Sequence, residues 1–276
     1  MQGQHQAYFP GDIYNGFIEL VTPDGQHLKS RPLGLSYDDG NNTVFIAVLT
    51  NSIGQLVGSN QVIYPDAFTR FTGFKADLVY TYTKAGFEQD IVLRAQPPTP
   101  ESLGLNPATA RLQVLTEFFS PPQPAIQARE LAAQAGLSLT DQSLGFGAMQ
   151  MVPGRAFLLG NKAVDSGAQV GKQWLLLDGR QFLVEEVPVD AIAGGLAGKH
   201  NRKTQKLIAP RSGCCFNTGV PNNHILIQTN QNIMKQPSSL RCGLALAFAT
   251  ALFSVTQAQA QIIASDNFNS YSLGKR

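Results

Sequence analysis

The chain has 276 residues, enough for one large or two small domains with a substantial core. Apolar residues make up 43% of it and charged residues only 14%, a balance that suits an extracellular or cell-surface β protein. The formal net charge of +2 is too small, and Lys and Arg are too dispersed, for a nucleic-acid or anionic-membrane surface. We therefore expect no nucleic-acid partner.

The cysteines all lie late in the chain, at Cys214, Cys215 and Cys242. Residues 1–213 therefore offer neither a disulfide framework nor a thiolate zinc site. Because adjacent cysteines rarely form a disulfide with each other, we interpret Cys214 and Cys215 as incidental residues of a linker. We expect no metal and no other cofactor.

Two apolar runs near the start, residues 13–21 and 27–37, are separated by a turn that contains Asp24 and Gly25. An Asp-Gly pair in this position favours a hairpin, since both central residues of a type I′ turn need positive φ. Residues 43–49 predict a further strand.

The clearest signal for the fold class is the alternation of apolar and polar residues in 75–95. One face would carry Ala76, Leu78, Tyr80, Tyr82, Phe87, Gln89, Ile91 and Leu93. This pattern predicts a hairpin with one buried face and one solvated face. Residues 61–68 are assigned only to an edge strand or a strand end, because Pro65 lacks a backbone donor.

Later segments predict more strands and two short helices. The strands are expected at 111–119, 146–152 and 155–159, and in a second Asp-Gly hairpin at 173–177 and 181–187. An Ala-rich helix over 125–135 would end at Gly136, and a small closing helix would cover 189–196.

These patterns predict an all-β fold: an antiparallel β-sandwich built from hairpins over residues 8–198, with one or two short helices. An alternative divides this region into two packed sub-domains, 8–122 and 136–198. Residues 199–233 have no periodicity, which predicts a disordered linker. A disordered C-terminal tail is expected over 261–276.

Residues 234–260 have the pattern of a secretory signal peptide. Lys235 and Arg241 precede an apolar run at 243–255, and a small-residue cleavage pattern follows, with Ala258 and Ala260 as the signal-like cleavage residues. The run is shorter than the roughly 20 residues that span a bilayer, so we expect a helix but no stable membrane span.

The internal position of this segment favours a fusion of two reading frames at Met234. On that hypothesis residues 199–233 are translated intergenic sequence, and the joined product has no function as a unit. The alternative is a genuine linker between two modules.

Candidate catalytic or binding residues are few. Asp38, Asp39, Asn41 and Asn42 could offer oxygen ligands to calcium, but without EF-hand spacing an ordinary turn is the better interpretation. Glu185 and Glu186 are adjacent in a strand and would point to opposite faces, so they cannot form a hydrolase pair.

The other acidic and aromatic residues have ordinary structural interpretations. Glu88, Asp90 and Glu117 are possible carboxylate partners, although a solvated face explains them more simply. Exposed aromatics could stack on sugar rings, but core packing is the better interpretation for most of these: Tyr80, Tyr82, Phe87, Phe118, Phe119 and Trp174.

Residues 13–198 resemble uncharacterised β-rich segments of large bacterial surface proteins that also carry RHS or YD repeats. The resemblance rests on SIGQLVGSNQVIYPDAF, YTYTKAGFEQDIVLR and LNPATARLQVLTEFF. It brings no catalytic residues, and no YD repeat occurs here. It implies a secreted or cell-surface location, with other domains of a larger surface protein as partners.

The terminal SDNFNSYSLGKR is similar to the first strand of secreted bacterial lectin-like jelly-roll modules. The function expected overall is a noncatalytic structural or adhesive module of a bacterial secreted or cell-surface protein. The alternative is a carbohydrate-binding module or a secreted glycoside-active enzyme, with an extracellular glycan as partner.

Overall fold

The computed structural model describes residues 5–70, 73–84, 86–158, 167–196 and 207–216. The strands of the first half are β1 (Gln6–Tyr8), β2 (Ile18–Val21), β3 (His27–Asp38), β4 (Thr43–Leu49), β5 (Gln55–Val57), β6 (Gln61–Thr69), β7 (Lys75–Tyr82) and β8 (Gly86–Leu93). Those of the second half are β9 (Arg111–Phe119), β10 (Ala125–Glu130), β11 (Thr140–Phe146), β12 (Met149–Leu158), β13 (Ala168–Leu177), β14 (Arg180–Pro188) and β15 (Leu207–Phe216). The helical segments are η1 (Glu101–Leu103), η2 (Pro107–Thr109) and α1 (Val189–Leu196).

The strand pairings form a closed circuit. Strand β9 pairs antiparallel with β14 along one edge and with β3 along the other, which closes the sheet on itself. The circuit runs through β3, β4, β6, β7, β8, β15, β12, β13, β14 and β9, and each of these pairings is antiparallel. Each strand of the circuit therefore has a neighbour on both sides, which limits exposed sheet edges.

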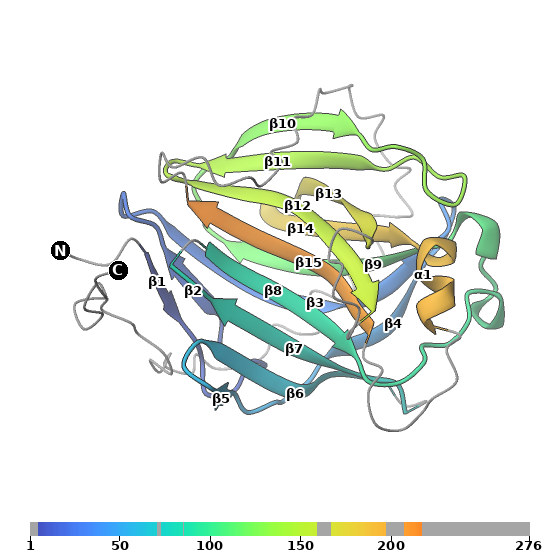
Figure 1. Cartoon of the computed structure of the whole chain (residues 1–276), viewed down its shortest axis with the longest axis horizontal. Coiled ribbons are helices and arrows are strands. Elements are labelled where there is room, and N and C mark those ends of the chain that lie inside the picture. Colours follow the sequence, from blue (N-terminus) through green and yellow to red (C-terminus); the bar gives the residue numbers. More distant parts are fainter. Residues whose placement is uncertain (1–4, 71–72, 85, 159–166, 197–206, 217–276) are drawn as a thin grey trace, which may run out of the picture.

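The circuit is flattened into two layers with the core between them (Figure 1). Strands β7, β8, β15 and β12 form the near layer in this view, and β3, β9 and β14 lie behind them. One core cluster extends from Ala7 to Ile192 and includes Leu35, Tyr64 and Leu144. The predicted all-β sandwich is confirmed, and its core draws on both halves of the chain.

Both Asp-Gly hairpins predicted from the sequence are present, as β2–β3 and β13–β14. In the second, Asp178 and Gly179 have φ of 47° and 76°, as a type I′ turn requires. In the first, only Gly25 has a positive φ, 81°, so the hairpin is confirmed but its turn is of another type.

Strands β7 and β8 form the predicted hairpin, with Ala76 opposite Leu93. Its second face was expected to be solvated, and that expectation is wrong. Val79 and Val92 on this face are buried and pack with Phe157 of β12. The alternation correctly identifies the inward residues, but it does not show that other groups also cover the outer side.

The helix predicted over 125–135 is wrong, because residues 125–130 form strand β10, paired with β11. Ala135 and Gly136 have φ of 48° and 78° and lie in a tight turn in which Gln134 and Leu137 exchange two backbone hydrogen bonds of 2.9 Å. A left-handed glycine suits both a helix end and a hairpin turn, so Gly136 alone could not distinguish them. The second predicted helix is confirmed as α1.

Strand β6 is not the edge strand predicted from Pro65. It pairs with β7 on one side and with β4 and β5 on the other. Its register against β7 shifts between Tyr64 and Phe68, and Asp66 there has a φ of 51°. Pro65 is thus accommodated at a bulge, which removes the need for its missing donor.

The linker predicted over 199–233 contains strand β15, which pairs with β8 and with β12. The expected disorder is therefore wrong for residues 207–216. Composition missed this strand because its order comes from two neighbouring strand edges and not from its own pattern. The remainder of 199–233, the signal-like segment and the expected tail lie outside the described residues.

Candidate functional site

The interior of the sandwich contains a row of directly paired residues that changes from apolar to charged. In order from β3 to β11, the row consists of Leu35, Val114, Glu185, Lys172 and Asp141. All five residues are 0% exposed. Paired residues on neighbouring strands point to the same side of the sheet, and Leu35 and Val114 belong to the core. The row therefore places three charged side chains inside the sandwich.

The charged residues of this row are held by a specific set of contacts. Lys172 donates a hydrogen bond from Nζ to Oδ1 of Asp141, and the two form a buried ion pair. Arg129 of β10 donates from Nη2 to Oδ2 of the same carboxylate at 3.3 Å. Two cations thus flank one carboxylate, and Glu185 lies directly across the strand pair from Lys172. We call Arg129, Asp141, Lys172 and Glu185 the interior charged cluster.

The sequence interpretation missed the cluster, apart from naming Glu185. One signal could have revealed Lys172: it alternates with Val170 and Trp174, which are both buried in the core. A lysine at an inward position of a strand needs a buried partner, because an unpaired buried charge is very costly. No comparable pattern distinguishes Asp141, whose partner becomes evident only from the pairing of β11 with β13.

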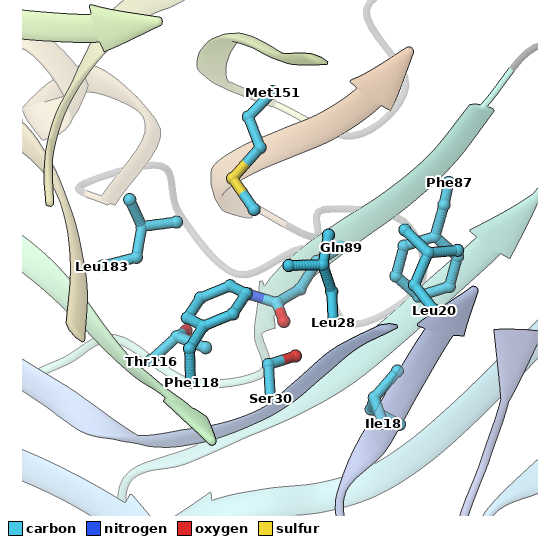
Figure 2. A pocket seen from close by; sticks show the side chains of 10 residues that line it. All are labelled: Ile18, Leu20, Leu28, Ser30, Phe87, Gln89, Thr116, Phe118, Met151 and Leu183. Carbon is cyan, nitrogen blue, oxygen red and sulfur yellow. The ribbon is translucent and has the colours of Figure 1, made fainter. Parts of the chain in front are cut away.

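A small cavity lies between the two layers, and Figure 2 shows the side chains that surround it. Its volume is about 40 Å³, and its lining consists of Ile18, Leu20, Leu28, Ser30, Phe87, Gln89, Thr116, Phe118, Met151 and Leu183. One water molecule needs roughly 10–15 Å³ of cavity volume, whereas drug-sized ligands occupy pockets of roughly 300 Å³ or more. The cavity therefore has room for a few water molecules and not for a sugar.

The cavity is close to the interior charged cluster. Leu183 and Thr116 line it, and they lie two residues from Glu185 and Val114 on the same sides of β14 and β9. Burial raises the pKa of Tyr80, and Tyr64 and then Glu185 add smaller contributions in the same direction. Most side chains around the cavity are apolar, and its polar ones are Ser30, Gln89 and Thr116.

The two adjacent glutamates lie on opposite faces of β14, as the sequence predicts. Glu185 points inward, whereas Oε2 of Glu186 accepts a hydrogen bond of 3.0 Å from Nε2 of Gln113. Burial raises the pKa of Glu186, and the Gln113 hydrogen bond and Arg111 oppose that rise. The sheet separates the two carboxylates, so they do not face one cleft.

The remaining candidate carboxylates are also dispersed. Glu117 points outward from β9 and accepts a hydrogen bond of 2.7 Å from Nε of Arg180, and its burial contradicts the solvated face predicted for it. Glu88 and Asp90 point outward from β8, in the other layer, and Asp90 is buried, which contradicts the solvated face predicted for it. The structure does not bring Glu117 together with either of these two acids.

The loop that offered possible calcium ligands is organised by its own hydrogen bonds. Oδ1 of Asp39 accepts from the backbone N–H groups of Asn41 and Asn42 at 2.8 and 2.7 Å. Oδ2 of Asp39 accepts from the N–H of Asn106 at 3.0 Å. Within the described ranges, no group of three or more His, Cys, Asp or Glu residues is arranged to hold a metal ion. These contacts support the turn interpretation.

Most of the candidate aromatic residues lie in the core. Tyr80, Phe87, Phe118 and Trp174 are buried, and the rings of Tyr80 and Phe87 stack with centroids 5.2 Å apart. The core interpretation is correct for these four. Phe119 differs, because it is partly exposed on the outer side of β9.

An aromatic and cationic surface surrounds Phe119 on the outer side of β3 and β9. The rings of Phe17 and Phe119 lie 6.1 Å apart between centroids. The guanidinium of Arg31 is 5.6 Å from the centre of the Phe119 ring, and Nζ of Lys29 is 5.0 Å from that of Phe17. We call Phe17, Lys29, Arg31 and Phe119 the aromatic–cation face. The sequence interpretation named only Phe119 of these four.

The signal-like cleavage residues Ala258 and Ala260 lie outside the described residues. In the part of the chain that the structure describes, no helix is both long enough and apolar enough to cross a membrane.

Comparison with known proteins gives no matching family model, no matching curated protein and no matching solved structure. The fold and the interior charged cluster are therefore interpreted from this chain alone.

Proposed function

We propose that the chain is a noncatalytic structural and adhesive module of a bacterial secreted or cell-surface protein. The observation that supports this most is the closed circuit of antiparallel strands. Long pairings such as β3–β9, which extends from Lys29↔Phe119 to Asp38↔Arg111, distribute backbone hydrogen bonds along most of these two strands. Such a scaffold suits a module that must stay folded outside the cell.

The aromatic–cation face supports the adhesive part of the proposal. Half-buried Phe17 and Phe119 offer flat apolar contact area, and Lys29 and Arg31 add donors and positive charge. Aromatic residues and arginine are enriched where proteins bind other molecules. Neighbouring domains of a larger surface protein are the partners that we propose for this face.

Protease treatment of intact cells that produce the protein tests its location. We expect fragments of the described domain to be released into the medium while a cytoplasmic marker protein stays intact. Recovery of the chain only from the lysed cytoplasmic fraction would contradict the proposal.

Carbohydrate binding is the second candidate function, and the aromatic–cation face is the observation that favours it. Aromatic rings stack on the apolar faces of sugars, and Arg and Lys donate to hydroxyl groups. A glycan array probed with the full chain would give binding that Phe119→Ala abolishes and Leu176→Ala keeps, because Leu176 is exposed at 65% on another strand. Turnover of a glycan that is lost in Glu117→Gln would instead favour the enzyme alternative.

A further inference from the structure

The interior charged cluster holds an amine and a carboxyl group in contact where water has no access. Nζ of Lys172 lies within hydrogen-bonding distance of Oδ1 of Asp141, and both residues are 0% exposed. Glu185, also 0% exposed, is the direct cross-strand partner of Lys172. Neighbouring side chains at such positions lie close together on one face of the sheet. An amine, a carboxyl group and a second carboxylate are thereby gathered in one dry site.

A buried ion pair by itself adds little to the stability of a fold. Removing two charges from water costs about as much as their attraction returns, and apolar residues of similar size often stabilise a fold more. Transfer of one proton within the pair gives an amine and a carboxylic acid. An amine and a carboxylic acid are the reactants that form an amide bond. Because the fold holds the two groups in contact, the reaction avoids the entropy loss of bringing two separate molecules together.

We propose that Lys172 and Asp141 become joined by an intramolecular amide bond, with Glu185 as the proton carrier. The site is a modification site within the core, and its chemistry does not depend on the location or binding partner proposed above.

The reaction balances with the residues present. A proton passes from Nζ to Oδ1 of Asp141, and the Nζ lone pair then attacks Cγ. Glu185 accepts one proton from the nitrogen and delivers it to Oδ1, which leaves as water when the Cγ–Oδ1 bond breaks. An ammonium and a carboxylate thus give an amide and water. Glu185 returns to its starting form, and no oxidant or reductant is needed.

Arg129 is placed to assist the attack. Its Nη2 donates to Oδ2 of Asp141, the oxygen on which negative charge gathers when the amine adds to Cγ. A donor fixed at the position of a developing oxyanion lowers the barrier most in a water-excluded site. The small cavity beside the cluster offers space for the water that leaves.

The bond would join two strands that are otherwise weakly connected. The pairing of β11 with β13 is parallel and consists of Asp141↔Lys172 alone. A covalent link at this pair would join β11 and β13 at their single paired position, between residues 31 positions apart in the chain.

The mass of tryptic peptides from the purified full chain tests the proposal, and terminal processing does not affect it. We expect peptides 130–155 and 163–180 to appear as one species, uncut after Lys172 and lighter than their sum by the about 18 Da of one water molecule. Separate peptides with cleavage after Lys172 in the folded wild-type protein would overturn the proposal.

Variants separate the roles of the three groups. Lys172→Arg keeps the charge but cannot form the amide, so we expect separate peptides. Asp141→Asn should still link, with the loss of about 17 Da as ammonia. Glu185→Gln should stop the reaction, whereas the matched control Glu186→Gln should link as the wild type does. A linked Glu185→Gln protein would overturn the role of Glu185, and circular dichroism would show that each variant is folded.

Discussion

Tyr64 of β6 donates a hydrogen bond of 2.7 Å from Oη to the backbone carbonyl of Pro10, which lies 54 positions earlier in the chain. Tyr64 is fully buried, and this burial raises the pKa of its hydroxyl, so the group stays a donor over the ordinary pH range. We expect Tyr64→Phe to lower the free energy of unfolding by about 1–2 kcal/mol, because the buried carbonyl of Pro10 would lose its donor. Urea denaturation of the full chain measures the difference.

The matched control is Tyr8→Phe. The hydroxyl of Tyr8 also makes a hydrogen bond of 2.7 Å, to Oε1 of Gln6, but this bond is exposed and water can replace it. We expect a change within about 0.5 kcal/mol. Equal losses in the two variants would mean that the contact with Pro10 contributes nothing beyond an ordinary surface hydrogen bond.

Two glycines should respond to alanine with opposite signs. Gly179 has a φ of 76° in the β13–β14 turn, where a Cβ is strained, so Gly179→Ala should destabilise the fold by about 1–2 kcal/mol. Gly194 lies in α1, and an added Cβ there meets no atom within 4 Å. Gly194→Ala should therefore stabilise the fold by about 0.5–1 kcal/mol. Thermal melting of both variants compares the signs directly.

The sequence predicts the strands whose residues alternate between core and surface. Residues 43–49 and 111–119 form strands with those bounds, and the Asp178–Gly179 pair marks the hairpin that follows. Local pattern is sufficient here because these strands have one apolar side, and turn chemistry fixes where the chain reverses.

Elements that depend on distant neighbours could not be predicted in this way. Strand β10 is Ala-rich and forms because β11 offers it an edge, and β15 forms between β8 and β12. The interior charged cluster could not be predicted for the same reason, since Asp141 and Glu185 approach Lys172 from two other strands. Tertiary context, and not local propensity, decides such positions.

Asp39 should matter for stability without binding calcium. Its carboxylate accepts hydrogen bonds from three backbone N–H groups, those of Asn41, Asn42 and Asn106. We expect Asp39→Ala to cost about 2–3 kcal/mol, because charge-assisted hydrogen bonds are lost and the two connected loops separate. Differential scanning calorimetry of the wild type should give one melting temperature with calcium or with a chelator. A melting temperature that rises by several degrees on adding calcium would instead support calcium binding at this loop.

His5 makes the fold sensitive to acid. The side chain is buried beside the ring of Tyr82, with centroids 4.6 Å apart, and burial lowers its pKa from 6.5 to about 4. Between these two values the unfolded chain binds a proton at His5 that the folded chain excludes. Stability should therefore be complete above pH 6.5 and decline as the pH falls towards 4, by on the order of 2–3 kcal/mol, with no further loss from this residue below that.

Replacing the imidazole with a ring that cannot be protonated isolates this effect. His5→Phe keeps the aromatic contact with Tyr82. The contributions of the other titrating groups are the same in both proteins, so they cancel in the difference between the two unfolding free energies. We expect the difference to shift in favour of the variant as the pH falls from 6.5 to 4. A difference that stays constant over this range would show that His5 is as free to take up a proton in the folded protein as in the unfolded chain.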